Sequence, residues 1–209
     1  MTNLPEHWLA IMRNLRAAAF ALPIALFVVP AASNAAARTL SSQIEVLDKV
    51  PAVRPEFPVP NEPDQLFFIQ RSVNDNTVIY AANLDGHGHL DRDTPINVYW
   101  RWYNVDGHKK ALNFLERMMA YGVRTVSSSS SGGNVVVRLA ALPERVLTVD
   151  EDDRGKPEAV LRMGNHPARL VYVYLQVDDH GFMPSVKAID VFGVDKLTGK
   201  ALRERIVQE

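Results

Sequence analysis

Hydrophobic and polar side chains alternate in short runs from residue 66 to the end of the chain, which is the pattern of half-buried β-strands. The clearest run covers residues 96–103, where one face carries Ile96, Val98, Trp100 and Trp102 and the other carries Asn97, Tyr99, Arg101 and Tyr103. Further runs cover residues 66–70, 77–83, 135–139, 145–149, 159–163, 170–178, 186–194 and 201–206. We therefore predict a mainly β fold, an antiparallel β-sandwich or barrel of about nine strands with one packed helix.

The predicted helix is the one segment that breaks this alternation, residues 111–121. Leu112, Leu115 and Met119 recur there at helical spacing, and Gly122 follows as a candidate C-terminal cap. A second, adjacent apolar stripe consists of Phe114, Met118 and Tyr121. With two apolar stripes, the helix should be largely buried against the sheet.

The beginning of the chain has the organisation of a signal peptide. Arg13 and Arg16 precede an uncharged apolar stretch, residues 17–30, and small residues then lead to a cleavage site after Ala35. An uncleaved membrane anchor is the alternative, but the apolar stretch is shorter than the roughly 20 residues of a spanning helix. We predict removal of residues 1–35, a periplasmic or secreted protein, and no membrane span after cleavage.

Residues 36–64 differ in composition from the rest of the chain, because five prolines stand at positions 51, 55, 58, 60 and 63. Proline fixes its own φ and pushes the preceding residue toward extended geometry. Such a segment is either a tether that holds the domain away from its surroundings or a strap along the domain surface. We assign residues 36–64 to a proline-rich tether and residues 65–209 to a single β-rich domain, with the strap left open.

Composition removes several classes of function. The chain has no cysteine, so neither a disulfide nor a lipoprotein anchor is available. Signal cleavage takes away two of the 23 basic and one of the 24 acidic residues, and a balance so near neutrality does not indicate a nucleic-acid or anionic-membrane partner. No nucleophile motif or glycine-rich phosphate loop occurs. We predict no cofactor, and a non-enzymatic role is favoured.

The loop at residues 83–93 is the strongest metal candidate in the sequence. Its possible ligands stand at alternate positions: Asp85, His87, His89 and Asp91. A calcium loop would need a bidentate glutamate where Thr94 stands, and a zinc site would need a distant ligand that the sequence does not indicate. Asp-Gly is also common turn chemistry, so a hairpin loop without metal is the favoured interpretation.

The polar face of residues 96–103 suggests a small-molecule site. Tyr99, Arg101 and Tyr103 would line a cavity together with Tyr172 and Tyr174 if both strands face the inside of a barrel. Tyrosine combines apolar surface with a hydroxyl, and arginine can pair with a carboxylate or phosphate. The favoured alternative is an outer face on which the aromatic side chains pack and Arg101 stays solvated.

A second candidate group consists of Arg71, Tyr80 and Glu116. Because a buried charge needs a partner, we expect Arg71 to pair with Glu116 if both face inward. Together with Tyr99 and Arg101, this group would be the site of an enzyme of unknown reaction. Clusters of this kind are more often architectural than catalytic.

Three sequence blocks resemble an uncharacterised bacterial family of exported proteins, a domain of unknown function. They are residues 68–83 (FIQRSVNDNTVIYAAN), residues 95–101 (PINVYWR) and residues 112–123, which end in AYGV. The resemblance extends over residues 66–206 and implies a single domain. It implies no established activity, so no catalytic residue is carried over to this chain.

Three functions are compatible with these observations. The leading hypothesis is an exported module that is structural or binds a small ligand, with the cavity inside a β-barrel as its sharper form. The second is an enzyme that uses the cluster around Arg71, Tyr99 and Arg101. The third is a protein-interaction domain presented on the proline-rich tether.

Overall fold

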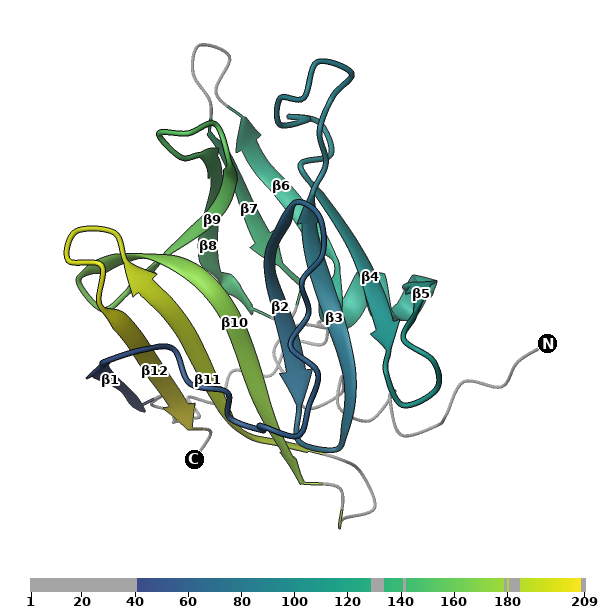
Figure 1. The fold of residues 1–209 in the computed structure, drawn as a ribbon, viewed down its shortest axis with the longest axis vertical. Coiled ribbons are helices and arrows are strands. Elements are labelled where there is room, and N and C mark those ends of the chain that lie inside the picture. Colours follow the sequence, from purple (N-terminus) through teal and green to yellow (C-terminus); the bar gives the residue numbers. More distant parts are fainter. Residues whose placement is uncertain (1–40, 129–133, 141, 179, 181–184, 208–209) are drawn as a thin grey trace, which may run out of the picture.

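The computed structural model describes residues 41–128, 134–140, 142–178, 180 and 185–207. In this part of the chain, twelve strands form one mixed sheet (Figure 1). The strands are β1 (Ser41–Leu47), β2 (Gln65–Arg71), β3 (Asn74–Ala82), β4 (Ile96–Trp102), β5 (His108–Ala111), β6 (Val123–Ser128), β7 (Val135–Leu139), β8 (Leu142–Glu151), β9 (Pro157–Met163), β10 (His166–Asp178), β11 (Ser185–Asp195) and β12 (Ala201–Val207). The mainly β class is confirmed. The signal segment, residues 1–35, lies outside the described residues.

The sheet divides at β10, which has 13 residues and is the longest strand. One edge of β10 pairs with β11 in antiparallel fashion along residues 168–178. On the other edge, residues 166–169 pair with β9, and residues 172–175 pair in parallel with β2. Two wings, β9-β8-β7-β6 and β2-β3-β4-β5, therefore leave the same edge of β10, while β11, β12 and β1 continue the sheet on the other side.

The prediction of an antiparallel sandwich or barrel of about nine strands is only partly right, because every pairing of the described strands except β10–β2 is antiparallel, but twelve strands form a single sheet. The result is one open, strongly curled sheet with a parallel pair at its centre (Figure 1). A long strand makes this possible, because 13 residues span about 43 Å and offer room for two partners along one edge. A register irregularity between Leu170 and Tyr172 separates the two pairings, and such bulges bend a strand and increase its twist.

The main core lies on the inner face of the curled sheet, between the two wings. It takes side chains from both, for example Phe67, Val78 and Trp100 from one wing and Val137 and Leu161 from the other. The predicted inward face of β4 is confirmed: Trp100 is 3% exposed, and the side chains of Ile96, Val98 and Trp102 pack against the same core. Burial of these apolar surfaces is the main force that holds the wings together.

The predicted helix over residues 111–121 is shorter and less buried than its pattern indicated. An α-helical turn, α2 (Phe114–Glu116), is followed by a π-helical segment, η1 (Arg117–Tyr121). Residues 108–111 instead form β5 on the edge of β4, and the helix begins only at Phe114, after the N-cap residue Asn113, which forms a capping box with Glu116. Phe114 is 73% and Met118 47% exposed, so of the second apolar stripe only Tyr121 is buried.

Gly122 is the C-cap residue of η1, as the sequence predicted, but it does not adopt the left-handed conformation common at such caps. Its backbone is extended, with φ −65° and ψ 157°. A side-chain carbon at this position would overlap the carbonyl oxygen of Arg117. The close passage of the chain past the end of η1 therefore admits only glycine without rearrangement.

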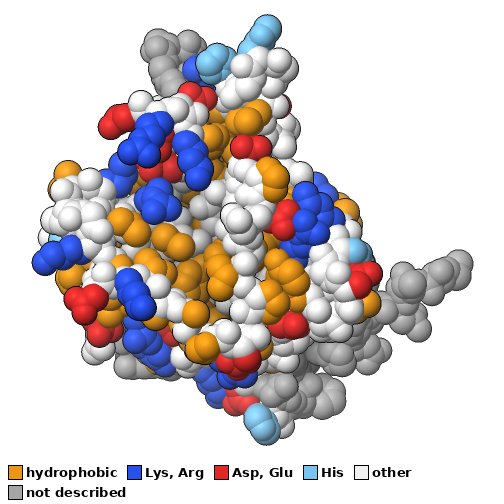
Figure 2. Space-filling view, in the orientation of Figure 1, with side chains coloured by type: hydrophobic (Ala, Val, Ile, Leu, Met, Phe, Trp, Pro, Cys, Tyr) orange, Lys and Arg blue, Asp and Glu red, His pale blue; other side chains and the backbone are white. Residues whose placement is uncertain are grey.

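The proline-rich segment between β1 and β2 lies along the outer face of the sheet, and we call residues 48–64 the strap. In Figure 1 the strap runs across the front of β2 and β3. A second apolar cluster beneath it contains Phe68, Ile79, Ala81, Tyr99, Tyr172, Tyr174 and Phe192, and Leu47, Val50 and Val53 pack against that cluster. In Figure 2 hydrophobic side chains are visible over the middle of this face, with Lys and Arg side chains around them.

Hydrogen bonds, in addition to apolar contacts, hold the strap on the sheet. The Gln70 side chain donates to the Pro58 carbonyl at 3.0 Å, and the Tyr172 hydroxyl donates to the Pro51 carbonyl at 2.6 Å. The sequence left two interpretations open for this segment, a tether and a strap along the domain surface. Residues 48–64 lie along the surface as a strap. Within the described residues, no helix is long and apolar enough to cross a membrane.

Candidate functional site: an arginine-lined hollow on strands β8 and β9

Arg101, the leading ligand-binding candidate from the sequence, is held by the chain itself. Its Nε and Nη2 donate to the two carboxylate oxygens of Glu62 in the strap, each at 2.6 Å, and its Nη1 donates to the Gly107 carbonyl at 2.8 Å. This bidentate pair raises the pKa of Arg101 and lowers the pKa of Glu62. Arg101 therefore already has the carboxylate partner that a ligand was expected to supply.

Tyr99 and Tyr103 flank this ion pair on the outer face of β4. The Tyr99 hydroxyl donates to Glu62 at 3.4 Å, and the ammonium of Lys109 lies 4.5 Å from the Tyr99 ring centroid. Burial raises the pKa of Tyr99 to about 12 and also raises the pKa of Tyr103. Both rings therefore belong to the packing between β4 and the strap.

Tyr172 and Tyr174 share the outer face with Tyr99. Tyr172 stacks between Phe68 and Phe192, with ring centroids 5.1 Å and 4.5 Å away. Burial raises the pKa of Tyr172 to about 12, and burial likewise raises that of Tyr174. The structure thus brings these tyrosines to the same side of the sheet as Tyr99, as the sequence analysis supposed, but the strap covers that side.

Arg71, Tyr80 and Glu116 lie on the opposite, inner face. The Arg71 guanidinium sits over the Trp100 ring, 4.8 Å from its centroid, and donates to the Asn74 side chain at 2.9 Å. Burial lowers the pKa of Arg71, while the nearby Tyr121 and Glu116 oppose that effect. A cation over an aromatic face, with a polar partner, is a stable arrangement for a buried arginine.

The other two members of this group also have structural partners. The Tyr80 hydroxyl donates to the Tyr121 carbonyl at 3.0 Å, and burial raises the pKa of Tyr80 well above its usual range. Glu116 accepts from the Trp100 indole at 3.3 Å and from the Asn113 backbone at 2.9 Å.

The five side chains of the enzyme hypothesis therefore do not converge. Side chains of a strand alternate between the two faces of the sheet. Arg71 and Tyr80 accordingly point into the main core, whereas Tyr99 and Arg101 point toward the strap. Sequence analysis placed Tyr80, Tyr99 and Arg101 on strands and Glu116 on a helix, but it could not relate the faces of different strands.

The loop at residues 83–93, the metal candidate, is organised as a tight hairpin. The Asp85 carboxylate accepts the backbone N–H groups of His87 and His89 at 2.8 and 3.0 Å, and Asp91 accepts those of Asp93 and Thr94. These hydrogen bonds lower the pKa of both aspartates. Among the described residues, no three His, Cys, Asp or Glu side chains gather closely enough to hold a metal ion.

A charged cluster that sequence analysis missed surrounds Asp190 on the outer face of β11. Asp190 is 1% exposed, and Arg203 contacts its carboxylate at 2.9 Å. Arg205 lies 3.3 Å from the same carboxylate and also donates to Gln176. The alternation of residues 186–194 could have placed Asp190 beside Phe192, but only strand pairing brings the arginines of β12 to it. Glu45 lies 3.5 Å from Arg203 and supplies a second carboxylate, so the two arginines are balanced within the protein and the cluster is structural.

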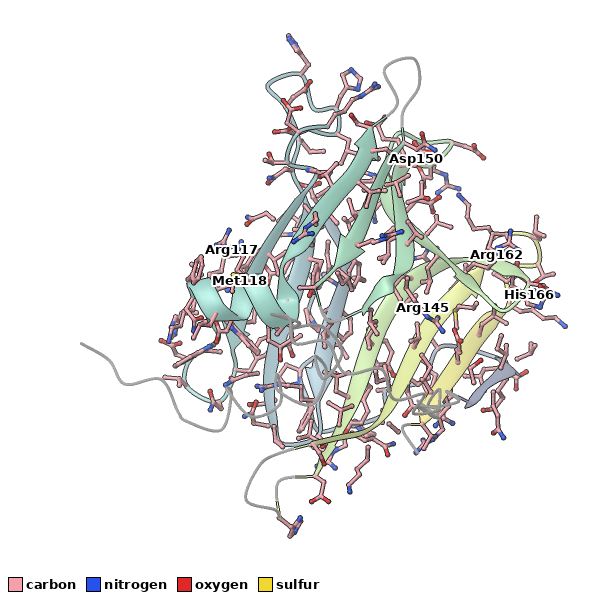
Figure 3. The ribbon with its side chains drawn as sticks, turned by 180° about the vertical axis from the view of Figure 1, so that it is seen from behind. Arg117, Met118, Arg145, Asp150, Arg162 and His166 are labelled. Carbon is pink, nitrogen blue, oxygen red and sulfur yellow. The ribbon has the colours of Figure 1, made fainter. Side chains whose placement is uncertain are left out.

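A hollow of about 530 Å³ opens on strands β8 and β9, in a part of the sheet that no candidate from the sequence occupies. Its lining consists of Arg145, Val146, Thr148, Val160, Leu161, Arg162, Gly164 and Pro167. Figure 3 labels Arg145 and Arg162 in this region and Asp150 at the far end of β8. The lining therefore combines apolar surface with two guanidinium groups, and its volume falls within the range of small-molecule sites.

The pairing register places further arginines beside this hollow. Arg124 on β6 lies opposite Arg138 on β7, and Arg138 lies opposite Val146 on β8. The β8–β9 pairing ends at Leu147 and Leu161, so Val146 and Arg162 are the next residues along these strands, and Arg162 lies opposite Pro167 on β10. Directly paired residues of antiparallel strands point to the same face. These five positions thus form one row across five strands.

A second row lies beside the first, two residues further along the strands. It consists of Val136, Thr148, Val160 and Arg169, which are paired in that order on β7, β8, β9 and β10. We call the surface made by the two rows the arginine face, after Arg124, Arg138, Arg162 and Arg169. The hollow overlaps the arginine face, because Val146, Thr148, Val160, Arg162 and Pro167 belong to both.

The arginines of this region differ in whether they form an ion pair with a carboxylate of the protein. Arg145 donates to both carboxylate oxygens of Glu204 at 2.7 and 2.6 Å, and this contact raises the pKa of Arg145. Arg124, Arg138, Arg162 and Arg169 are exposed, and none of the four has an ion pair within the described residues. Arg145 is thus neutralised inside the protein, whereas the arginine face presents unneutralised positive charge.

Comparison with known families defines the domain. A family model described as a domain of unknown function (DUF4833) matches residues 67–205. The chain belongs to this family. No curated protein and no solved structure matches the chain.

The DUF4833 match covers one of the candidate sites completely and another only in part. Residues 67–205 include the hollow and all four arginines of the arginine face. They leave out β1 and the strap, and with the strap Glu62, the partner of Arg101. The resemblance seen in the sequence blocks is therefore confirmed as family membership, and the match brings no assigned activity to any residue.

Proposed function

We propose that this protein is exported and binds a small anionic amphiphile in the hollow on β8 and β9. The observation that carries the proposal is Arg162, which lines the hollow, is exposed, and has no ion pair within the described residues. Val146, Val160 and Pro167 lie in the same lining. A cation beside an apolar surface complements a ligand with a negative head group and a hydrocarbon body.

The other sites support ligand binding less well. At Arg101, a ligand carboxylate would have to displace Glu62 from a bidentate pair with two contacts of 2.6 Å. At Arg71, a ligand would have to enter the main core, because Arg71 is 4% exposed. Arg162 needs neither rearrangement, and Arg145 is already positioned in the lining by Glu204.

A fluorescence titration with 1-anilinonaphthalene-8-sulfonate, an aromatic sulfonate, tests this site. Arg162→Gln should weaken binding of the dye about tenfold or more, because a hydrogen bond to a charged group contributes roughly 1.5–3 kcal/mol. Arg117→Gln is the matched control, since Arg117 is an exposed arginine on η1 that lies outside the lining. Equal affinity of wild type and Arg162→Gln would refute the site.

The natural ligand and the cellular address need separate measurements. Mass spectrometry of small molecules that copurify with the protein from its own cell envelope should find an anionic amphiphile, and Arg162→Gln should lose it. N-terminal sequencing of the mature protein should begin near Ala36, after the small-residue cleavage site. A mature chain that begins at Met1 would contradict export by signal cleavage.

A further inference from the structure

The charge of the arginine face extends well beyond the hollow. Arg124 and Arg138 lie directly opposite one another on β6 and β7, outside the lining of the hollow. Like charges at directly opposed positions of a sheet are unfavourable. Both side chains are exposed and neither has an ion pair within the described residues, so solvent screens their repulsion but no carboxylate of those residues neutralises it. An external anion that contacts both arginines would offset it.

The side chains between the arginines indicate which anion fits. Three of the intervening positions are valines, Val136, Val146 and Val160, and Val146 is 43% exposed. Neither row contains an aromatic residue, although sites for single-stranded nucleic acid rely on aromatic side chains for stacking onto bases. Guanidinium groups on either side of an aliphatic strip instead match phosphate groups next to hydrocarbon chains.

The chain's own N-terminal residues are poorly suited to cover this surface. Residues 1–40 contain one acidic residue, Glu6, against three arginines, Arg13, Arg16 and Arg38. If these residues lay on the arginine face, they would add positive charge to positive charge. Charge complementarity therefore favours an occupant from outside the chain.

Resting on the proposed function, we infer that the anionic amphiphile is a phospholipid presented by a bilayer, and that the arginine face docks on its phosphate groups. Arg124, Arg138 and Arg169 contact neighbouring head groups, while Arg162 binds the head group whose hydrocarbon part reaches the hollow. Each basic side chain near an anionic membrane surface adds a modest increment of affinity, and several in one plane add up.

Vesicle sedimentation with the mature protein tests the inference. The protein should bind phosphatidylglycerol vesicles, bind phosphatidylcholine vesicles much less, and lose binding as the NaCl concentration rises. The double variant Arg124→Gln with Arg138→Gln should weaken binding to phosphatidylglycerol about thirty-fold. Arg117→Gln with Arg154→Gln removes two exposed arginines outside the arginine face and should change binding less than threefold, an about tenfold contrast.

The dye titration separates this inference from the proposed function. Arg124→Gln with Arg138→Gln should keep wild-type affinity for the sulfonate dye, because neither residue lines the hollow. Unchanged vesicle binding of this variant, or equal effects of the two double variants, would overturn the lipid inference and leave the hollow intact. Binding to heparin without binding to phosphatidylglycerol vesicles would overturn it in favour of a polyanionic polymer. Failure of Arg162→Gln to weaken dye binding would overturn the proposed function instead.

Discussion

The carboxylate of Glu62 accepts two hydrogen bonds of 2.6 Å from the guanidinium of Arg101, and this pair joins the strap to β4. Glu62 is 9% and Arg101 23% exposed at the side chain, so the pair is shielded from most of the solvent. The geometry explains why a residue that the sequence offered as a ligand-binding cation serves the fold. The pair also ties the strap to the folded domain, and point substitutions can test how much this contact contributes to stability.

Glu62→Gln should lower the free energy of unfolding by about 1–3 kcal/mol, between the values for exposed and buried ion pairs. Urea denaturation followed by tryptophan fluorescence measures the change. Lys109→Gln is the control, because the Lys109 ammonium is 3.7 Å from the Glu62 carboxylate and the side chain is 54% exposed. It should cost less than about 0.5 kcal/mol. If the two variants are equally stable, the bidentate pair does not hold the strap.

The same pair should make stability depend on pH. Arg101 lowers the pKa of Glu62 below 4.5, so the folded state binds fewer protons than the unfolded state in that range. The stabilising contribution is therefore complete at neutral pH and is lost as pH falls through the pKa of the folded state. Between about pH 6 and about pH 3, wild type should lose more stability than Glu62→Gln. Parallel losses in the two proteins would contradict the assignment.

Trp100→Ala should cost about 3–5 kcal/mol, the usual range for a large aromatic side chain removed from a core. Trp100 is 3% exposed, meets the Tyr121 ring edge-on at 5.2 Å between centroids, and lies under the Arg71 guanidinium. Phe114→Ala provides the contrast, because the Phe114 side chain is 73% exposed and should cost less than about 0.5 kcal/mol. Chemical denaturation of both variants decides whether burial or aromatic identity governs the loss.

Gly122→Ala should destabilise the domain by more than about 2 kcal/mol, because the added methyl group would overlap the Arg117 carbonyl oxygen and force the chain apart at the end of η1. Gly86→Ala is the matched substitution, since no atom lies within 4 Å of the added carbon there. Thermal melting of the two variants measures the difference. A melt of Gly122→Ala that coincides with that of Gly86→Ala would mean that the backbone moves aside easily.

Several features of the fold could be predicted from local patterns. The alternation over residues 96–103 identified the inward face of β4, because successive side chains of a strand must point to opposite sides. The Asp-Gly turn chemistry of residues 83–93 favoured a hairpin, and Asp85 indeed accepts backbone N–H groups there. The helix predicted over residues 111–121 begins only at Phe114, because Ala111 pairs with Tyr99 on the edge of β4 and Asn113 is the N-cap, and apolar periodicity shows neither.

The candidate sites could be predicted only in part. Tyr99 and Tyr172 were expected on one side of the sheet and do share it, but the strap that covers them is joined to the sheet through contacts distant in sequence. The arginine face was missed because net charge is a sum over the whole chain, whereas binding depends on where charges lie. Arg124 on β6 and Arg169 on β10 can be assigned to the same surface only when four strand registers are known.

By itself the sequence indicated nine of the twelve strands, but not β1, β5 or β6, the core-facing side of β4, and the lack of any cysteine to cross-link the chain. Those properties follow from the two-residue period of a strand and from composition, and both are local. Only the tertiary structure decided that β10 carries two wings on one edge, that Glu62 reaches Arg101, and that the four arginines of the arginine face form one surface. These relationships depend on strand partners and register, which are set by the burial of the whole core and not by any short stretch of chain.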